Sequence, residues 1–236
     1  FEVSVTDVGE VPTGLSLTGS EIAENESTGT LVGSLSTEDE DEDESFDYEL
    51  VSGEGSTDNT SFALDGGNLL SAAIFDYESK TQYSIRVRVT DKYDLSLEEA
   101  LTIEVTNVNE LPTDILLSNN DIMERSDVGS VVGTLSAVDE DLADTYTYAL
   151  VAGDGADDNT SFSINGADLV SAEEFDFETK SSYSVRVQVT DGGGEVLQKS
   201  FDIDILDIEE NVTGILISDN QINENVSSGS TIGNFS

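Results

Sequence analysis

The sequence predicts an all-β chain built from tandem Greek-key β-sandwiches, with about seven strands in each sandwich. Three observations predict this architecture: an internal repeat of about 100 residues, short segments that alternate apolar and polar side chains, and turns rich in Gly, Asp and Asn. A period of this length is the size of a whole domain, well above the 20–50 residues of a solenoid unit. We find no sustained helical period.

The repeat is visible in a four-residue segment that occurs three times: Ile22-Ala23-Glu24-Asn25, Ile122-Met123-Glu124-Arg125 and Ile222-Asn223-Glu224-Asn225. Residues 13–112 align with residues 113–212 without a gap. We therefore expect two complete domains in these ranges, the end of a preceding domain at 1–12 and the start of a following domain at 213–236. The chain is then expected to be a section of a longer array.

The strongest strand pattern is Tyr83-Ser84-Ile85-Arg86-Val87-Arg88-Val89-Thr90, which returns at 183–190. Side chains two residues apart point to the same face of a strand, so Tyr83, Ile85, Val87 and Val89 should line the core. The next strand contains Leu101, Ile103 and Val105, with Phe201, Ile203 and Ile205 as its counterparts. Earlier strands are expected near 14–18, 30–36, 46–52, 61–64 and 68–72.

Two further features recur in both repeats, and the first of them has both a functional and a structural interpretation. Asp58-Asn59-Thr60-Ser61-Phe62 recurs unchanged at 158–162. It is a ligand loop or a glycan acceptor, or else a turn that leads the phenylalanine into the core, and we favour the turn. Arg86 and Arg186 alternate outward, and we expect each to pair with an acidic side chain on a neighbouring strand.

The composition excludes several classes of function. The 51 Asp and Glu against 8 Lys and Arg give a net charge of −43, so the chain cannot neutralise nucleic-acid phosphates or bind an anionic membrane surface. The absence of His and Cys excludes zinc, triad and thiol chemistry based on those residues. No apolar run is long enough to cross a bilayer. The acidity indicates solubility in salt, cation binding or both, whereas disorder disagrees with the regular apolar pattern.

Acidic pairs spaced i, i+2 recur in register: Asp39 and Asp41, Asp139 and Asp141, Asp76 and Glu78, Asp176 and Glu178. On an extended backbone, both members of such a pair point the same way and can reach one ion. Oxygen clusters of this kind suit a hard cation, and Ca²⁺ takes six to eight oxygen ligands. The recurrence in register carries the interpretation, because single acidic pairs are expected by chance in so acidic a chain.

The segments that join the domains are only a few residues long. They read Asp7-Val8-Gly9-Glu10-Val11-Pro12, Asn107-Val108-Asn109-Glu110-Leu111-Pro112 and Asp207-Ile208-Glu209-Glu210-Asn211. Successive domains are therefore expected to lie close together, with the carboxylates and amides of the linker at the joint.

Taken together, these residues resemble cadherin repeats, and the resemblance covers the whole chain. The family's motifs occur here in the family's order: Ile-x-Glu-Asn at Glu24, Glu124 and Glu224, Asp-Arg-Glu as Asp76-Tyr77-Glu78 and Asp176-Phe177-Glu178, a shortened linker before Pro12 and Pro112, Asp-x-Asp at 39–41 and 139–141, and Thr-Asp at Thr90-Asp91 and Thr190-Asp191. The resemblance implies an immunoglobulin-like sandwich and calcium at the joints.

The resemblance also implies which residues bind Ca²⁺. At the middle joint they are Glu24, Asp76, Glu78, Asn107, Asn109, Glu110, Asp139, Asp141 and Asp191. Incomplete sets flank it: Asp7, Glu10, Asp39, Asp41 and Asp91 before, and Glu124, Asp176, Glu178, Asp207, Glu209 and Glu210 after. Asp144 is a weaker candidate. Departures from the family pattern at Gly9, Asn107 and Arg125 argue against three ions at every joint, and one or two ions are expected at the middle joint.

The function predicted from these observations is a non-catalytic, calcium-rigidified extracellular stalk or adhesion segment of a secreted surface protein, whose form of linker and acidity favour a bacterial source. Its partners would be calcium ions, adjacent repeats of the same chain, and a cell-surface glycan or protein, with no nucleic acid and no membrane insertion. A polysaccharide- or protein-binding module and a spacer in a secreted multidomain enzyme remain alternatives. Paired carboxylates can hydrolyse glycosides, but the pairs lie in polar runs, and no Trp is present to stack a sugar.

Overall fold

The computed structural model describes residues 1, 8–41, 45–210, 216–218, 220–232 and 234. The chain forms two compact units. The first unit consists of Phe1–Thr113 together with two segments from later in the chain, Asp139–Thr145 and Asp191–Glu195. The second unit consists of Asp114–Val138, Tyr146–Thr190 and Val196–Ser236.

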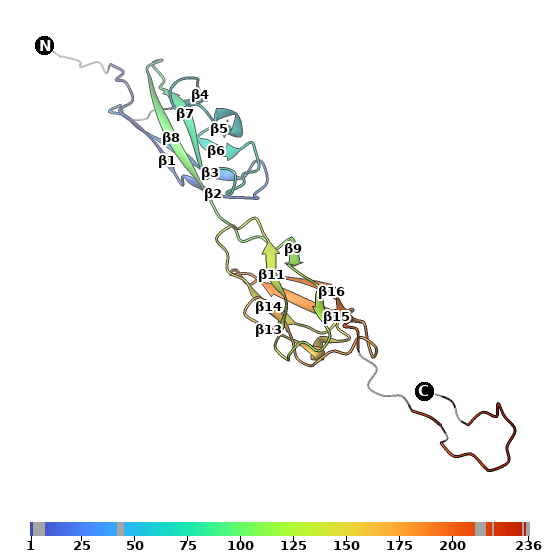
Figure 1. Ribbon diagram of the computed structural model, residues 1–236. Helices are drawn as coiled ribbons and strands as arrows, with labels where there is room; N and C mark the ends of the chain where they lie inside the picture. The colour runs from blue at the N-terminus through green and yellow to red at the C-terminus, as the bar shows by residue number, and fades with distance from the viewer. Residues whose placement is uncertain (2–7, 42–44, 211–215, 219, 233, 235–236) are drawn as a thin grey trace. The chain divides into compact units, whose positions relative to one another are not determined.

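The first unit is a sandwich of two four-stranded sheets (Figure 1). One sheet has the order β1-β3-β6-β5, with strands Gly14–Thr18, Leu31–Glu38, Asn68–Ser71 and Phe62–Asp65. The other has the order β2-β8-β7-β4, with strands Glu21–Ala23, Ser96–Thr106, Gln82–Thr90 and Asp47–Leu50. Strands β2 and β8 pair in parallel, and the other pairs are antiparallel.

The second unit repeats this topology. One sheet has the order β9-β11-β14-β13, with strands Asp114–Leu117, Val131–Val138, Asp168–Ser171 and Phe162–Asn165. The other has the order β10-β16-β15-β12, with strands Asp121–Met123, Val196–Leu206, Ser182–Thr190 and Thr147–Leu150. The all-β tandem sandwich predicted from the sequence is confirmed. Each sandwich has eight strands in place of about seven, because a three-residue strand, β2 or β10, is too short to show an alternating pattern.

The alternating strand β7 supplies the centre of the first core. Ile85, Val87 and Val89 are fully buried, as the period of two predicted. Phe75 stacks on Phe62 with ring centroids 5.3 Å apart, and it meets Tyr83 edge-on at 4.7 Å. The same aromatic triad occurs in the second unit at Phe162, Phe175 and Tyr183. Aromatic contacts of this kind add to the stability gained from burial.

The asparagine of the repeated 58–62 segment is structural. Asn59 lies in a 3₁₀ turn, η1 (Asn59–Ser61), and its Nδ2 donates to the carbonyl of Val51 at 2.8 Å. Its Oδ1 accepts the N–H of Arg86 at 2.9 Å, and Phe62 then enters the core. Asn159, in η2 (Asn159–Ser161), makes the same two bonds. The side-chain amides are therefore occupied, which supports the turn over the glycan acceptor.

The two outward arginines differ in their partners. Arg86 Nε donates to Glu98 Oε2 at 3.0 Å, which confirms an acidic partner on the neighbouring strand. The prediction is wrong for Arg186, whose Nε donates to the neutral Oε1 of Gln198 at 3.1 Å. Position 198 is the register partner of position 188 on the adjacent strand, and the repeat has Gln there where the first unit has Glu.

The aromatic triad predicts a large loss of stability on truncation. Phe75 is 1% exposed, so Phe75→Ala should lower the free energy of unfolding of the first unit by about 3–5 kcal/mol through a cavity that cannot collapse. The adjacent Ile74 is 64% exposed, and Ile74→Ala should change the free energy of unfolding by less than about 0.5 kcal/mol. Urea denaturation followed by circular dichroism measures both variants, and equal losses would contradict the described core.

Candidate metal centre

A buried carboxylate anchors the linker of the first unit. Glu24 follows strand β2 and is 3% exposed. Its Oε2 accepts the N–H of Tyr77 at 2.7 Å, and its Oε1 accepts the N–H of Val108 at 2.9 Å. Each oxygen of this buried charge therefore receives a backbone donor from a different segment, which is how a buried ionised group is tolerated. Glu24 fixes the start of the linker against the turn that contains Tyr77.

Glu24 belongs to a cluster of three carboxylates, which we call the Glu110 cluster. Oxygens of Glu24, Glu78 and Glu110 all lie within 4.8 Å of one another. Asn25 Nδ2 donates to Glu110 Oε1 at 2.7 Å. Among the described residues, nothing donates a hydrogen bond to Glu110 Oε2, which is buried. The cluster thus brings three negative groups together and leaves one buried oxygen without a partner.

This crowding changes the acidity of the cluster. Burial raises the pKa of Glu110 to about 7, and the charges of Glu24 and Asp141 add to the effect. Burial likewise raises the pKa of Glu78, again with contributions from Glu24 and Asp141. Nearby like charges and loss of solvent both disfavour the ionised form of a carboxyl group. A positive charge near Glu110 would therefore favour its ionised form at neutral pH.

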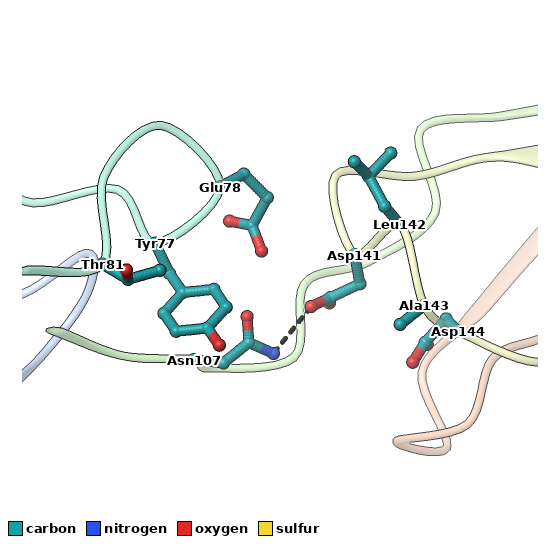
Figure 2. A pocket seen from close by; sticks show the side chains of 8 residues that line it. All are labelled: Tyr77, Glu78, Thr81, Asn107, Asp141, Leu142, Ala143 and Asp144. Atoms are coloured by element: carbon teal, nitrogen blue, oxygen red, sulfur yellow. Dashed lines mark hydrogen bonds between the residues drawn. The ribbon is translucent and has the colours of Figure 1, made fainter.

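The segment 139–145 brings a further carboxylate to this cluster. Asp141 is buried, and its Oδ2 accepts the N–H of Glu110 at 2.9 Å. Its Oδ1 accepts Nδ2 of Asn107 at 2.7 Å, as Figure 2 shows. Glu78, Asn107 and Asp141 line a pocket of about 390 Å³. The polar ends of these three side chains point toward one another in this view, while Leu142 points away.

A second group of carboxylates, the Asp139 cluster, consists of Asp139, Asp144 and Asp191, with oxygens within 4.8 Å of one another. Asp139 Oδ2 is buried without a hydrogen-bond partner among the described residues. Asp191 is 7% exposed, and its Oδ2 accepts Nδ2 of Asn109 at 3.0 Å. Burial opposes ionisation of Asp191, but this bond and the backbone donors of the loop outweigh it and lower its pKa.

The residues around Pro12 form a counterpart with fewer donors. The N–H of Glu10 donates to Asp41 Oδ2 at 3.0 Å, as that of Glu110 does to Asp141. Asp39 Oδ2 and Asp91 Oδ2 are buried and, within the described part of the chain, have no hydrogen-bond partner. Asp7 lies outside the described residues. Hydrogen bonds therefore link Glu10 to Asp41 and Asp41 to Asp39, whereas Asp91 accepts the N–H groups of Tyr93 and Leu95. Gly9 stands where the other linker has Asn109, so this linker offers no side-chain amide at that position.

The missing amide has a steric counterpart. A Cβ on Gly9 would lie 2.2 Å from Cδ2 of Tyr93, so the tyrosine ring fills the space of a linker side chain. At the equivalent contact, a Cβ on Gly193 would lie 2.1 Å from Cγ of Asn109. In the first case the linker has the glycine and the loop 91–95 has the large side chain. In the second case the loop 191–195 has the glycine and the linker has the larger side chain. A linker asparagine can donate its side-chain amide to the loop aspartate, as Asn109 does to Asp191, whereas Gly9 has no side chain to donate to Asp91.

The second unit contains its own cluster, which we call the Glu210 cluster and which consists of Glu124, Glu178, Asp207 and Glu210. Glu124 is 1% exposed and accepts the N–H groups of Phe177 at 3.0 Å and Ile208 at 2.7 Å. These bonds hold the pKa of Glu124 below its ordinary value. The guanidinium of Arg125 pairs with Glu210. This anchor repeats that of Glu24, with an added positive charge.

The structure does not bring every predicted residue into a cluster. Asp76 instead accepts the N–H and the hydroxyl of Ser79, both at 2.8 Å, and these bonds lower its pKa. Asp176 accepts the hydroxyl of Thr179 at 2.9 Å in the same way. Glu209 is exposed and lies outside the Glu210 cluster.

The assumption of an extended backbone at the acidic pairs is wrong. Residues 77–79 form a turn, in which the N–H of Lys80 donates to the carbonyl of Asp76 at 3.0 Å. At the other pair, the N–H of Asp41 donates to Asp39 Oδ1 at 3.0 Å, so that segment also bends. The pairs converge through turns rather than through a pleat. Asn25 was not predicted, and only its neighbour Glu24 marked the position; Asp144 was considered only as a weaker candidate.

The chemistry of the donor set fits calcium. All the clustered groups offer oxygen, and the sequence contains no His or Cys. Within the described ranges, four buried carboxylate oxygens lack a hydrogen-bond partner: Asp39 Oδ2, Asp91 Oδ2, Glu110 Oε2 and Asp139 Oδ2. Buried polar atoms without a partner are rare and costly, and a hard cation is the partner that carboxylate oxygens suit.

A family model for the cadherin domain matches residues 19–106 and 119–206. The chain is 30% identical to Protocadherin Fat 2 of Mus musculus over 167 residues, which cover 66% of this chain and 4% of that protein. It is 27% identical to Protocadherin-like wing polarity protein stan of Drosophila melanogaster over 203 residues, covering 80% of this chain and 6% of that protein. The chain therefore spans a small part of these relatives.

Solved structures share the fold. The extracellular domain of Protocadherin GammaB4 superposes with a TM-score of 0.64 at 22% identity, covering 92% of this chain and 37% of that one. Human Protocadherin-24 EC1-2 gives a TM-score of 0.62 at 20% identity, covering 84% of this chain and all of that one. In the described part of the chain, no helix has the length and apolar character needed to cross a membrane.

These relatives are animal proteins and do not support the bacterial source that the short linkers and the acidity predicted. A short linker and an excess of acidic residues do not by themselves distinguish animal from bacterial proteins.

The raised pKa of Glu110 predicts how the stability of the first unit depends on pH in metal-free buffer. The folded-state value of about 7 lies above the ordinary 4.5, so protonated Glu110 favours folding. This contribution is complete below about pH 4.5 and is lost as the pH rises through 7. Thermal unfolding should therefore occur at lower temperature at pH 8 than at pH 5, and Glu110→Gln should reduce that difference.

Groups with lowered pKa, such as Asp191, affect stability only at more acidic pH and leave this window undisturbed. Glu210→Gln is the matched control, since it lies in the second unit. An undiminished difference in Glu110→Gln would contradict the assignment.

The contact between Gly193 and Asn109 predicts strong coupling. Gly193→Ala should displace Asn109 and break its bond to Asp191, at a cost of about 1–3 kcal/mol in the free energy of unfolding. In an Asn109→Ala background the same change should cost little, which a double-mutant cycle measures. Gly192→Ala, whose Cβ would lie 3.3 Å from Asp144 Oδ1, serves as the control. Equal costs in both backgrounds would contradict the contact.

Proposed function

This chain belongs to the cadherin family, and we propose that calcium binds its loop clusters and stiffens the connection between successive repeats. Cadherin domains are non-catalytic modules that characteristically bind calcium, which confirms the prediction of a non-enzymatic chain. We propose residues 13–112 and 113–212 as the two complete repeats, with parts of neighbouring repeats at 1–12 and 213–236. The chain would then serve as an extracellular adhesion or spacer segment.

The observation that carries the proposal is the set of buried carboxylate oxygens without a partner. Glu110 Oε2 and Asp139 Oδ2 belong to different acidic clusters of the first unit, and both are buried. Without a bound ligand, each of these oxygens destabilises the folded state, because it has lost its hydrogen bonds to water and has gained no donor from the protein. A bound divalent cation supplies the missing partner and offsets the charge of the surrounding carboxylates.

The residues that would hold calcium fall into two groups in the first unit. Glu24, Glu78, Glu110 and Asp141 would supply carboxylate oxygens at the Glu110 cluster, with Asn107 at its edge. The Asp139 cluster would supply a second set of oxygens, from Asp139, Asp144 and Asp191. This grouping favours one or two ions and is compatible with the turn-capping roles of Asp76 and Asp176.

The proposed effect of the metal is mechanical. The segments 139–145 and 191–195 come from the second repeat, and their carboxylates and those of the linker repel one another when no cation is bound. At a separation of 4 Å the repulsion is about 1 kcal/mol per pair even at the dielectric constant of water. Calcium would replace this repulsion by shared ligation and would fix the linker. Extracellular sites of this type bind with dissociation constants of roughly 0.1–1 mM, which suits calcium outside cells.

The two alternatives gain no support. Neither a polysaccharide-binding module nor a spacer in a secreted enzyme corresponds to any relative described above. Contact with a cell-surface partner remains part of the proposal only in the general sense of adhesion, since the chain covers a small fraction of its curated relatives.

Calcium titration of this chain by calorimetry tests the proposal. We expect binding in the range of roughly 0.1–1 mM and a rise in the unfolding temperature by mass action. Asp139→Ala should weaken binding about tenfold or more, because it removes a ligand from the Asp139 cluster. Asp154→Ala removes an exposed carboxylate outside the clusters and is the control.

Small-angle scattering with and without calcium gives an independent measurement. We expect the maximum dimension to increase and the flexibility to fall when calcium is added, because the linker stiffens. Binding without a change in dimension would contradict the mechanical role. Absence of binding in the wild-type chain at 10 mM calcium would sink the proposal as a whole.

A further inference from the structure

The residue after the buried glutamate differs between the repeats. It is Asn25 in the first, Arg125 in the second and Asn225 in the third occurrence of the motif. All three adopt the left-handed backbone conformation, with φ of 61°, 60° and 65°. Asparagine tolerates this conformation well, whereas an arginine there is uncommon and strained. The backbone conformation is therefore the same in all three repeats, although the second repeat has a residue that suits it less well.

The two side chains reach equivalent acceptors with different charge. Asn25 Nδ2 donates to Glu110 Oε1 at 2.7 Å, a neutral donor to a linker carboxylate. Arg125 pairs its guanidinium with Oε1 of Glu210, the residue 100 positions after Glu110. Glu110 and Glu210 each belong to the carboxylate cluster of their own unit. One cluster thus contains a permanent positive charge where the other contains an amide.

We propose that Arg125 is an internal counter-cation, which makes the Glu210 cluster bind calcium more weakly than it would with asparagine at position 125. This inference rests on the proposed function, since it concerns the affinity of a cluster for calcium. On this proposal the Glu110 and Glu210 clusters would bind calcium at different concentrations, and the residue at positions 25 and 125 would set the difference.

The physical reason is competition. The Arg125 guanidinium satisfies one oxygen of Glu210, and that bond must break or rearrange before the same oxygen can ligate a metal. A fixed positive charge beside the cluster also repels a divalent cation. At the Glu110 cluster the structure instead leaves Glu110 Oε2 buried and without a partner in the described part of the chain. That cluster has an oxygen available for a metal and no guanidinium to displace.

The electrostatic part of the effect is moderate, because Arg125 has a side-chain exposure of 52%. Repulsion between a single and a double charge several ångströms apart in a water-like medium changes a dissociation constant by about tenfold. Salt screens charges at exposed sites, so the effect should shrink as ionic strength rises.

The test uses amide resonances that report each cluster separately. The N–H of Val108 donates to Glu24, and the N–H of Ile208 donates to Glu124. In a calcium titration of the ¹⁵N-labelled chain, Arg125→Asn should move the midpoint at Ile208 to about tenfold lower calcium and leave the midpoint at Val108 unchanged. The reciprocal change Asn25→Arg should move the midpoint at Val108 to about tenfold higher calcium and leave Ile208 unchanged.

Arg125→Lys is the matched control for charge, since it keeps a cation in the same left-handed position, and its Ile208 midpoint should stay near that of the wild type. A lysine variant that gains affinity as asparagine does would overturn the role of charge. An Ile208 midpoint identical in wild type and Arg125→Asn, with Val108 responding normally, would overturn this inference alone. If neither amide responds to calcium in any variant, the proposed function itself fails.

Discussion

The carboxylate of Glu24 is the constraint on which the rest of the first unit's site depends. It is buried, it is acidic, and it is held by the N–H groups of Tyr77 and Val108 rather than by a cation. Those two bonds place the Asp76–Glu78 turn and the start of the linker around one charge, so that Glu78 and Glu110 are forced into its neighbourhood. The two backbone donors replace the water that Glu24 loses on burial, but they do not remove the repulsion between Glu24 and the carboxylates of Glu78 and Glu110.

The repeat keeps this arrangement and varies the side chains around it. Glu124 has the same two backbone donors, which shows that the anchor is a property of the fold. The variation is compensated in pairs: Gly9 faces Tyr93 where Asn109 faces Gly193, and the amide is present in one case only. One backbone therefore supports joints with different donor sets. A substitution in the linker should therefore affect mainly the loop that it contacts, because there is no room for a large side chain on both sides of the contact.

The sequence predicted the sandwich because β7 and the second half of β8 alternate apolar and polar residues, and such alternation indicates that one face of the strand is buried. It did not predict β2, since Glu21–Ala23 is three residues long and its parallel pairing with β8 is a tertiary contact. Periodic acids located the clusters, but the assumed pleat was wrong, because turns at 39–41 and 76–80 direct those carboxylates. Asn25 carries no acidic signal, so its contact with Glu110 needed the structure.

The overall charge explains why these clusters require a partner from solution. With 51 acidic and 8 basic residues, the chain cannot neutralise its carboxylates internally. Ion pairs such as Lys80 with Asp58 and Lys199 with Asp114 lie on the sandwiches and outside the acidic clusters. Arg125 pairs with Glu210 in the Glu210 cluster, but no such pair is found at the Glu110 cluster among the described residues. Charge in the Glu110 cluster can then be reduced by a proton on Glu110, whose pKa is raised to about 7, or offset by a cation. In the proposed function, a divalent metal at neutral pH would satisfy the buried oxygens without removing the charge that attracts it, so metal binding and the folded linker would favour each other.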